Sequence, residues 1–344
     1  MNFEEEYLCD WITKSYKMQN IGLLNGKMGV CLFYFKAGKT LKNKKYTQYA
    51  ETLLDEIYES LSIDSPTNFS QGLSGIGWAI EYLVQEEYVE GNADEILYEI
   101  DNAVLKEITK PEALELGLDF GLVGYLLYLI QRLKNEKKTK DTLISCLKEE
   151  LFIWVINKIS ECYQKHLPFI ANDFRADLFR DFPVLIYALM KAHELNIYNS
   201  KIERIIIEFV PYLERNWPSL NINKLYLVCI LKYMSTRFSV PRLDKLTNVL
   251  LYSIDFDHIF EEIEEKAYGI RNGLSGLKYV LFCFLKLLSH EDIYRDIIFN
   301  LYLNIPEIQT SCIDNIELNL SYCDKIGLSE GFFGMKLIEL LLFR

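Results

Sequence analysis

The sequence predicts an all-α protein made of repeated helix pairs, because one glycine motif recurs along the chain at a nearly constant interval. Gly-Leu-Ser-Gly occurs at residues 72–75 and again at 273–276, and looser Gly-x-x-Gly copies begin at residues 26, 121 and 331. In all five copies, the motif stands where a polar linker gives way to an apolar helical run. Glycine suits such a helix start, because it tolerates unusual dihedrals and lets another backbone approach closely. Five copies indicate a repeat protein.

The spacing of the motifs predicts how many repeats there are. The first two intervals between first glycines are 46 and 49 residues, and the last is 58 residues. The 152 residues between Gly121 and Gly273 leave room for two degenerate copies of about 50 residues each. Candidates are the apolar runs at 180–190, with a proline near its start, and at 221–231, with an asparagine-rich start. Seven units then account for residues 1–344 as one domain, and such periods are typical of solenoids, propellers or closed arrays.

Apolar residues at helical spacing define the helices of each unit. A leading helix is expected within residues 1–20, where Tyr7, Leu8, Trp11 and Ile12 share a face. The expected pairs that follow are 30–37 with 46–61, a helix from Gly72 with 93–108, 125–133 with 143–162, and three further units at 173–213, 217–257 and 268–303.

The last expected helix, 334–343, has no outer partner within its own unit. We expect the leading helix to take that position, which would close the repeats into a ring. Apolar and polar residues alternate at 316–321, so a strand is possible there. The rest of the chain is expected to be helical.

Composition excludes several classes of function. The formal net charge is −12 and no basic stripe is interleaved with aromatic residues, so nucleic acid is not an expected partner. The acidic surface could attract a cationic peptide, although solubility is the simpler explanation. The longest apolar runs, such as 279–285, are far shorter than the roughly 20 residues of a membrane span.

The cysteines and the N-terminus indicate a cytoplasmic protein. The eight cysteines are scattered and form no Cys-x-x-Cys motif, which favours reduced and mostly buried thiols. The acidic segment 1–7 does not have the pattern of a signal peptide.

The glycine-rich helix starts, their spacing of about 50 residues and the closing segment Leu328-Ser-Glu-Gly-Phe-Phe-Gly resemble the lanthionine synthetase C-like family. The stretch 68–83 is similar to the second motif of that family, whereas units four and five match by position only. The resemblance implies an α,α-toroid of seven inner and seven outer helices. Enzymes of the family use zinc to activate a cysteine thiol of a bound precursor peptide, and the thiolate adds to a dehydroalanine or dehydrobutyrine to form a thioether ring.

The resemblance also implies three zinc ligands and one open coordination position. In the family they are a cysteine of unit five, in Trp-Cys-x-Gly, and the adjacent cysteine and histidine of unit six, in Cys-His-Gly. Here the unit-six positions hold Arg271 and Asn272, and the start of unit five, 220–223, holds no cysteine. Cys229 lies two helical turns further along. Because a guanidinium cannot ligate zinc, we expect a toroid without the metal.

Other candidate ligands are equally weak. Unit four should carry an acid–base histidine in His-Gly-x-x-Gly, but Arg180 and Asp181 stand there. The histidines have no partner at ligand spacing; they are residues 166, 193, 258 and 290. Cys312 and Cys323 flank unit seven and could approach each other, although buried thiols are the simpler interpretation.

The polar residues at the helix starts should face one end of the ring. The candidate binding residues are Asp119, Arg180, Asp181, Asn221, Arg271, Asn272 and Glu330. They could form a basin for a peptide or a carboxylate, with bidentate contacts from Arg271 and Arg180. Alternatively, Arg271 pairs with Glu330 or Asp119 and replaces zinc as an internal cross-link.

The motif glycines are expected to be structural, because they set the packing of the helix starts. They are Gly26, Gly29, Gly72, Gly75, Gly121, Gly124, Gly273, Gly276, Gly331 and Gly334.

Three functions follow as hypotheses. The first is a zinc-free relative of the cyclases that binds a ribosomal precursor peptide or a peptide-maturation enzyme. The second is a metal-free enzyme that uses Asp119, Asp181 or Glu330 as an acid or base. The third is an active zinc-dependent cyclase with displaced ligands.

Overall fold

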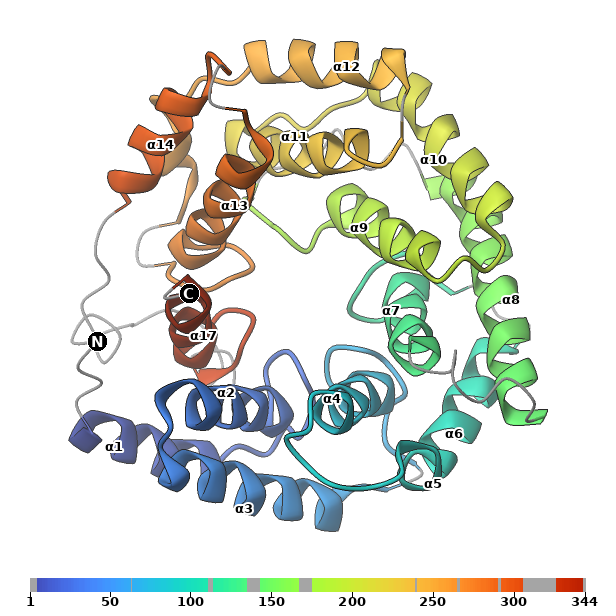
Figure 1. Cartoon of the computed structure of the whole chain (residues 1–344), viewed down its shortest axis with the longest axis vertical. Coiled ribbons are helices and arrows are strands. Elements are labelled where there is room, and N and C mark those ends of the chain that lie inside the picture. The colour runs from blue at the N-terminus through green and yellow to red at the C-terminus, as the bar shows by residue number, and fades with distance from the viewer. Residues whose placement is uncertain are drawn as a thin grey trace.

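A computed structural model of the chain describes residues 5–62, 64–110, 114–134, 143–166, 175–238, 240–264, 267–289, 292–305 and 326–342. Over these ranges the chain is all helical and forms a closed ring of two concentric layers (Figure 1). This is the α,α-toroid that the resemblance implied. The segment 316–321, where a strand was considered, lies outside the described residues.

The inner layer, within the described ranges, consists of one helix from each unit. Its members are α2 (Lys27–Leu41), α4 (Leu73–Gln85), α7 (Leu122–Leu133), α9 (Asp181–Glu194), α11 (Asn221–Ser235), α13 (Leu274–Leu287) and α17 (Phe332–Leu342). Each packs against the next, and α17 packs against α2, so the ring closes (Figure 1). Both degenerate units therefore contribute an inner helix, as their position in the chain predicted.

The outer layer runs around this ring. Its helices are α3 (Lys44–Ser60), α5 (Ala93–Ile96), α6 (Tyr98–Ile108), α8 (Leu143–His166), α10 (Asn199–Leu213), α12 (Pro241–Tyr252) and α14 (Arg295–Leu303). A short 3₁₀ helix, η3 (Ile259–Glu262), follows α12. The single outer helix expected at 93–108 is two helices, because the backbone leaves the helical conformation at Leu97.

The leading helix α1 (Glu5–Tyr16) lies beside the junction of the last and first inner helices. Its Trp11 ring stacks on Phe332 of α17, with ring centroids 4.2 Å apart. An aromatic pair of this kind adds about 0.5–1.5 kcal/mol beyond the area it buries. The N-terminal helix thus covers the last inner helix, as expected from the missing partner.

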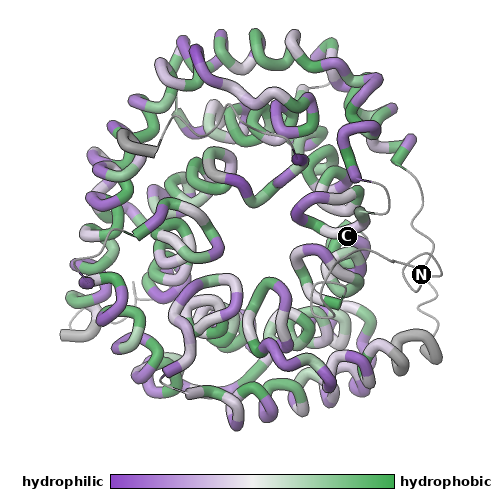
Figure 2. Tube along the Cα trace, turned by 180° about the vertical axis from the view of Figure 1, so that it is seen from behind, coloured by the Kyte–Doolittle hydropathy of each residue, from purple (hydrophilic) through white to green (hydrophobic). Residues whose placement is uncertain are grey.

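The core lies between the two layers. Its largest fully buried side chains include Tyr34, Tyr128, Phe152 and Phe209. Figure 2 shows hydrophobic and hydrophilic residues interspersed along the helices of both layers, as expected of amphipathic helices that bury one face. In the part of the chain described, no helix is both long enough and apolar enough to cross a membrane.

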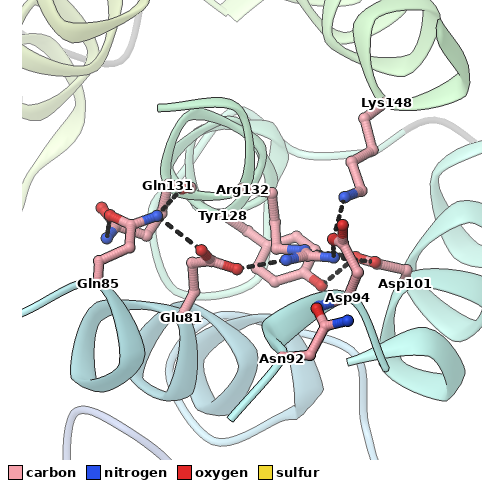
Figure 3. A network of polar contacts seen from close by, with 9 residues as sticks. All are labelled: Glu81, Gln85, Asn92, Asp94, Asp101, Tyr128, Gln131, Arg132 and Lys148. Atoms are coloured by element: carbon pink, nitrogen blue, oxygen red, sulfur yellow. Dashed lines mark hydrogen bonds and ion pairs between the residues drawn. The ribbon is translucent and has the colours of Figure 1, made fainter. Parts of the chain in front are cut away.

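A buried ionic network fixes units two and three to each other (Figure 3). The guanidinium of Arg132, 2% exposed, pairs with Glu81, with Asp101 at 2.6 Å and with Asp94 at 2.7 Å. Lys148 of α8 also reaches Asp94, at 2.7 Å. Three carboxylates and two cations from five helices, α4 to α8, therefore compensate each other, which a buried charge requires.

Three neutral side chains complete the same network (Figure 3). The Tyr128 hydroxyl donates to Asp101, and burial together with that carboxylate raises the pKa of Tyr128. The side chains of Gln85 and Gln131 exchange a hydrogen bond of 2.7 Å between α4 and α7. The network lies toward the C-terminal ends of these helices, away from the glycine-rich loops.

Candidate functional site

The motif glycines lie where a loop folds back onto the helix that follows it. A β-carbon at Gly75 would overlap the carbonyl oxygen of Phe69, and one at Gly276 would overlap that of Ile270. In each case the carbonyl belongs to the residue six positions earlier. Glycine is required there because the loop crosses the first turn of its own inner helix without space for a side chain.

These loops form a chain of backbone hydrogen bonds at one end of the ring, which we call the crown. In the loop before α4, the amides of Phe69 and Ser70 donate to the carbonyl of Asp119, before α7, at 3.0 and 3.1 Å. The amide of Leu24, before α2, donates to the carbonyl of Ser70 at 2.9 Å. The crown thus links units three, two and one in order.

The crown continues through the last two motif loops. Before α17, the amides of Leu328 and Ser329 donate to the carbonyl of Leu24 at 2.7 and 2.9 Å. Before α13, the amides of Ile270 and Arg271 both donate to the carbonyl of Ser329 at 2.9 Å. In each of these four loops the residue two positions before the first motif glycine is a donor, so the crown is the structural consequence of the repeated motif.

Within the described residues, the backbone hydrogen bonds of the crown leave out the loop of unit five. The amide of Leu178, in the loop before α9, donates directly to the carbonyl of Arg271 at 2.7 Å, although α11 stands between α9 and α13 in the inner layer. Helix α11 begins differently, because the amides of Asn221 and Ile222 donate to the carboxylate of Glu262 at 2.9 and 2.8 Å. A carboxylate at a helix N-terminus satisfies otherwise unpaired donors and complements the helix dipole.

The Arg271 side chain bridges the junction between the loops before α9 and α7. Among the described residues, no backbone hydrogen bond joins these two loops. Instead, Nε of Arg271 lies 3.1 Å from each carboxylate oxygen of Asp177, and Nη1 lies 2.7 Å from Oδ2 of Asp119. The guanidinium carbon is 5.9 Å from the centre of the Phe179 ring, a cation–π distance. One arginine therefore ties together units three, four and six.

The environment of this cluster keeps Arg271 charged. Both carboxylates favour its cationic form, and the pKa of Arg271 is raised despite the opposing effect of its burial. Burial also raises the pKa of Asp177, while Arg271 and the Phe179 amide oppose that shift. Oδ1 of Asp119 is buried and accepts no hydrogen bond from the described residues. The cluster thus has one carboxylate in excess and one acceptor oxygen that is not used.

Arg271 lies at the wall of an open basin of about 470 Å³ in the crown. The basin is lined by Arg175, Ala176, Asp177, Arg180, Glu264, Arg271, Asn272 and Glu330. Of the predicted binding residues, Arg180, Arg271, Asn272 and Glu330 are brought together here, and Asp119 is connected to them through Arg271. The lining carries three arginines and three carboxylates, which suits a polar or charged ligand.

Two predicted residues have other positions. The Asn221 side chain donates to Glu262 at 2.8 Å and accepts from the amide of Asp255 at 3.1 Å, so it supports the start of α11. Asp181 is the first residue of α9, and its side chain is not among those described. The ion pair that the sequence suggested between Arg271 and Asp119 is present, and Asp177 is its third member.

Asp177 was missed in the sequence, although a signal exists. It stands three residues before Arg180, the residue that precedes α9. The equivalent position in the five glycine motifs is always apolar: Leu23, Phe69, Leu118, Ile270 and Leu328. An aspartate there departs from the repeat. Its backbone amide is held by Asn223 Oδ1 at 3.1 Å, and the Asn223 amide group donates to the carbonyl of Arg175 at 2.8 Å.

The residues present do not fit a zinc ion at the position that the resemblance implied. Arg271 and Asn272 occupy the unit-six position, and the guanidinium is held by two carboxylates. The thiol of Cys229 instead faces the carbonyl of Val280 on α13, at 3.9 Å, and burial raises its pKa. Within the described ranges, no group of three potential ligands is close enough to hold a metal. Cys312 and Cys323 lie outside those ranges.

Comparison with known proteins agrees with this architecture, a double ring of helices whose inner helices begin at glycine-rich loops. Residues 17–173 match the sequence profile of the family described as lanthionine synthetase C-like protein. Among solved structures, nisin cyclase superposes with a TM-score of 0.64 at 16% identity, over 98% of this chain and 93% of that chain. No curated protein matches the sequence. Residues 17–173 are thus similar in sequence to the lanthionine synthetase C-like family, and the chain shares its toroid fold with nisin cyclase.

Proposed function

We propose that this protein is a zinc-free member of the lanthionine synthetase C-like family that binds a peptide at the crown, either a ribosomal precursor peptide or a segment of a peptide-maturation enzyme, in the cytoplasm. The observation that carries the proposal is the Arg271 cluster. Where the family resemblance places a cysteine ligand, a guanidinium is fixed by Asp177 at 3.1 Å and Asp119 at 2.7 Å. Activation of a thiol needs an open metal position, and a fixed cation bound to two carboxylates offers none.

The basin supports binding rather than bond formation. Arginines and carboxylates line it in equal number, so both backbone groups and charged side chains of a peptide would find partners. The name of the structural neighbour, nisin cyclase, supports a peptide as the ligand.

A second candidate function is a metal-free reaction at the same basin, and Asp177 favours it. Its carboxyl lines the basin, and burial raises its pKa, as in groups that donate or accept protons in catalysis. Arg271 contacts both Asp119 and Asp177, but of these two carboxylates Asp177 is the one that lines the basin, so it is the better acid–base candidate.

One assay separates these functions. A test peptide that contains one cysteine and one dehydroalanine is incubated with the protein, and free thiol is measured by alkylation and mass spectrometry. The metal content of protein purified without chelator is measured in parallel. We expect zinc well below one per chain, peptide binding, and thiol loss no faster than in a sample without protein.

The other outcomes identify the alternatives. Zinc near one per chain with thiol loss that a chelator stops would refute our proposal and restore a zinc-dependent cyclase. Thiol loss that survives the chelator but disappears in Asp177→Asn would support the metal-free reaction.

A further inference from the structure

The structure contains a second and larger concavity, which we call the rim groove. It has a volume of about 740 Å³ and lies between the loops before α4 and α7 and the outer helix α6. Thr67, Asn68, Asn102, Lys106, Phe120 and Tyr125 are among its lining residues. This volume lies within the range of roughly 300–1,000 Å³ that is typical of ligand sites.

An exposed aromatic residue and a fixed wall characterise the rim groove. The Phe120 side chain is 58% exposed, although its neighbours in the crown are engaged with other loops. The Tyr125 hydroxyl is 2.9 Å from the hydroxyl of Thr67, which belongs to the loop before α4. This contact holds the two lining residues in place. Several large apolar side chains of this chain are exposed, and Phe120 is one that lines a concavity, where it offers an apolar contact to a ligand.

Two carboxylates, Asp64 and Glu107, line the groove, and the groups in it that suit a carboxylate ligand are Lys106 and the asparagine amides. Lys106 is exposed and has no ion-pair partner among the described residues, whereas Lys110 pairs with Glu107 at 2.7 Å. The carbonyl oxygen of the Asn68 side chain accepts from the Gln71 amide at 2.9 Å, which leaves its NH₂ group as a donor. In a chain of net charge −12, an unpaired lysine beside amide donors is a local attraction for an acidic ligand.

The rim groove and the basin are separated by a single crown loop. Asp119 and Phe120 are consecutive residues of that loop: the first holds Arg271 at the wall of the basin, and the second lines the groove. Adjacent residues are only about 3.8 Å apart along the backbone, and an extended peptide advances about 3.3 Å per residue. A peptide docked in the groove would therefore need to cross only this loop to approach Arg271.

We propose that the rim groove docks an extended peptide segment, with an aromatic or large aliphatic side chain on Phe120 and a carboxylate on Lys106. The peptide would continue over the loop of Asp119 toward the basin. This inference rests on the proposed peptide-binding function and adds to it the docking site and the composition of the docked segment. The groove would hold the peptide, and the basin would receive the part that follows.

Fluorescence anisotropy with a defined probe tests this inference. The probe is the fluorescein-labelled octapeptide Gly-Ser-Phe-Gly-Glu-Ser-Gly-Ser, and its counterparts carry lysine for glutamate or serine for phenylalanine. Phe120→Ser and Lys106→Glu should each weaken binding of the first peptide by about fivefold to tenfold, the loss of a central contact. Lys106→Glu should also reverse the preference, so that the lysine peptide binds better than the glutamate peptide.

Matched controls come from α12, on the opposite part of the ring. Tyr252 is 70% exposed and Lys245 is exposed, so Tyr252→Ser and Lys245→Glu should leave binding unchanged. Asn102→Trp fills the groove from an exposed helical position, and it should abolish binding without loss of thermal stability. Stability of every variant is checked by circular dichroism.

The outcomes distinguish the groove from the basin. Binding that is lost in the groove variants but kept in Arg271→Lys would support the groove and count against the basin as a binding site. Equal effects of the groove and α12 variants, no reversal in Lys106→Glu, or no binding of the probe at millimolar concentration would overturn the groove, while the cysteine–dehydroalanine assay would still decide the function of the basin.

Discussion

Replacement of Arg271 by leucine gives the most direct test of the cross-link in the crown. The substitution keeps much of the side-chain volume and removes the only positive charge that contacts both Asp119 and Asp177 within the described residues. The two carboxylates then face each other without compensation in a site where they are each 20% exposed. We expect the free energy of unfolding to fall.

The magnitude follows from burial. Removal of one partner from a fully buried ion pair costs about 3–5 kcal/mol, and exposed pairs are worth about 0–1 kcal/mol. The side chains here are 20–25% exposed, so we expect an intermediate loss of about 2–3 kcal/mol. Unfolding entropy near 2.1 cal/mol/K per residue amounts to about 0.7 kcal/mol/K for this chain, so the midpoint should fall by about 3–4 °C.

Urea unfolding followed by circular dichroism measures the change, with calorimetry for the midpoint. The matched control is Arg175→Leu, which removes another arginine of the basin from an ion pair that is 3.5 Å long and mostly exposed. That control should cost no more than about 0.5 kcal/mol. Asp119→Asn in the Arg271→Leu background should recover part of the loss, because it removes one uncompensated charge.

A loss in Arg271→Leu as small as that in Arg175→Leu would refute the reasoning. It would mean that water or backbone groups compensate the two carboxylates, and that the crown closes without the guanidinium. The proposal that this cluster replaces a metal cross-link would then lose its physical basis.

Three further predictions concern other charged groups. Arg132→Met should lower the free energy of unfolding, measured by chemical denaturation, by about 3–5 kcal/mol, because it leaves Glu81 and Asp101 without their cation. A loss below about 1 kcal/mol would contradict the network of Figure 3. The pKa of Asp177 is raised in the folded state, so the folded protein binds the Asp177 proton more tightly than the unfolded chain does. The contribution of Asp177 to the free energy of unfolding therefore falls as the pH rises above the pKa that this carboxyl has in the unfolded chain. Asp177→Asn should therefore gain stability relative to the natural protein between pH 4 and pH 7, and a constant difference in urea titrations would show that the pKa is not raised. Glu262→Ala should cost about 1–2 kcal/mol through the lost cap of α11 and raise hydrogen exchange in its first turn, while unchanged exchange would argue against the cap.

Most of the fold could be predicted from the sequence, because the glycine motif marks a position that only glycine can fill. Gly75 and Gly276 lie against a carbonyl six residues earlier, and this contact recurs wherever a loop folds over its inner helix. Unit five has no such glycine and is placed by its position in the chain. The break at Leu97 was not predictable, because the apolar spacing of 93–108 continues across it.

The candidate site was only partly predictable. The pairing of Arg271 with Asp119 could be anticipated, because both stand two residues before the first glycine of their motifs. Asp177 stands three residues before Arg180, the residue that precedes its helix, and no glycine marks the register of that unit. Asn221 was placed in the basin by analogy with the other helix starts, but Glu262 holds it at the start of α11 instead. That contact comes from a 3₁₀ helix about 40 residues away, which no local pattern encodes.

The path of the crown supports the proposed zinc-free binding function. Unit five is the unit that the crown omits, and it is also one of the two units in which the family resemblance places zinc ligands. With its helix start held by Glu262, unit five supports the backbone of Arg175 and Asp177 through Asn223 and does not line the basin itself. A metal would have to join units five and six, whereas Arg271 joins units six, four and three. The Arg271 cross-link therefore joins a different set of loops from the one that a metal would join. Cysteine and histidine at positions 271 and 272 alone would remove this cross-link without completing a metal site.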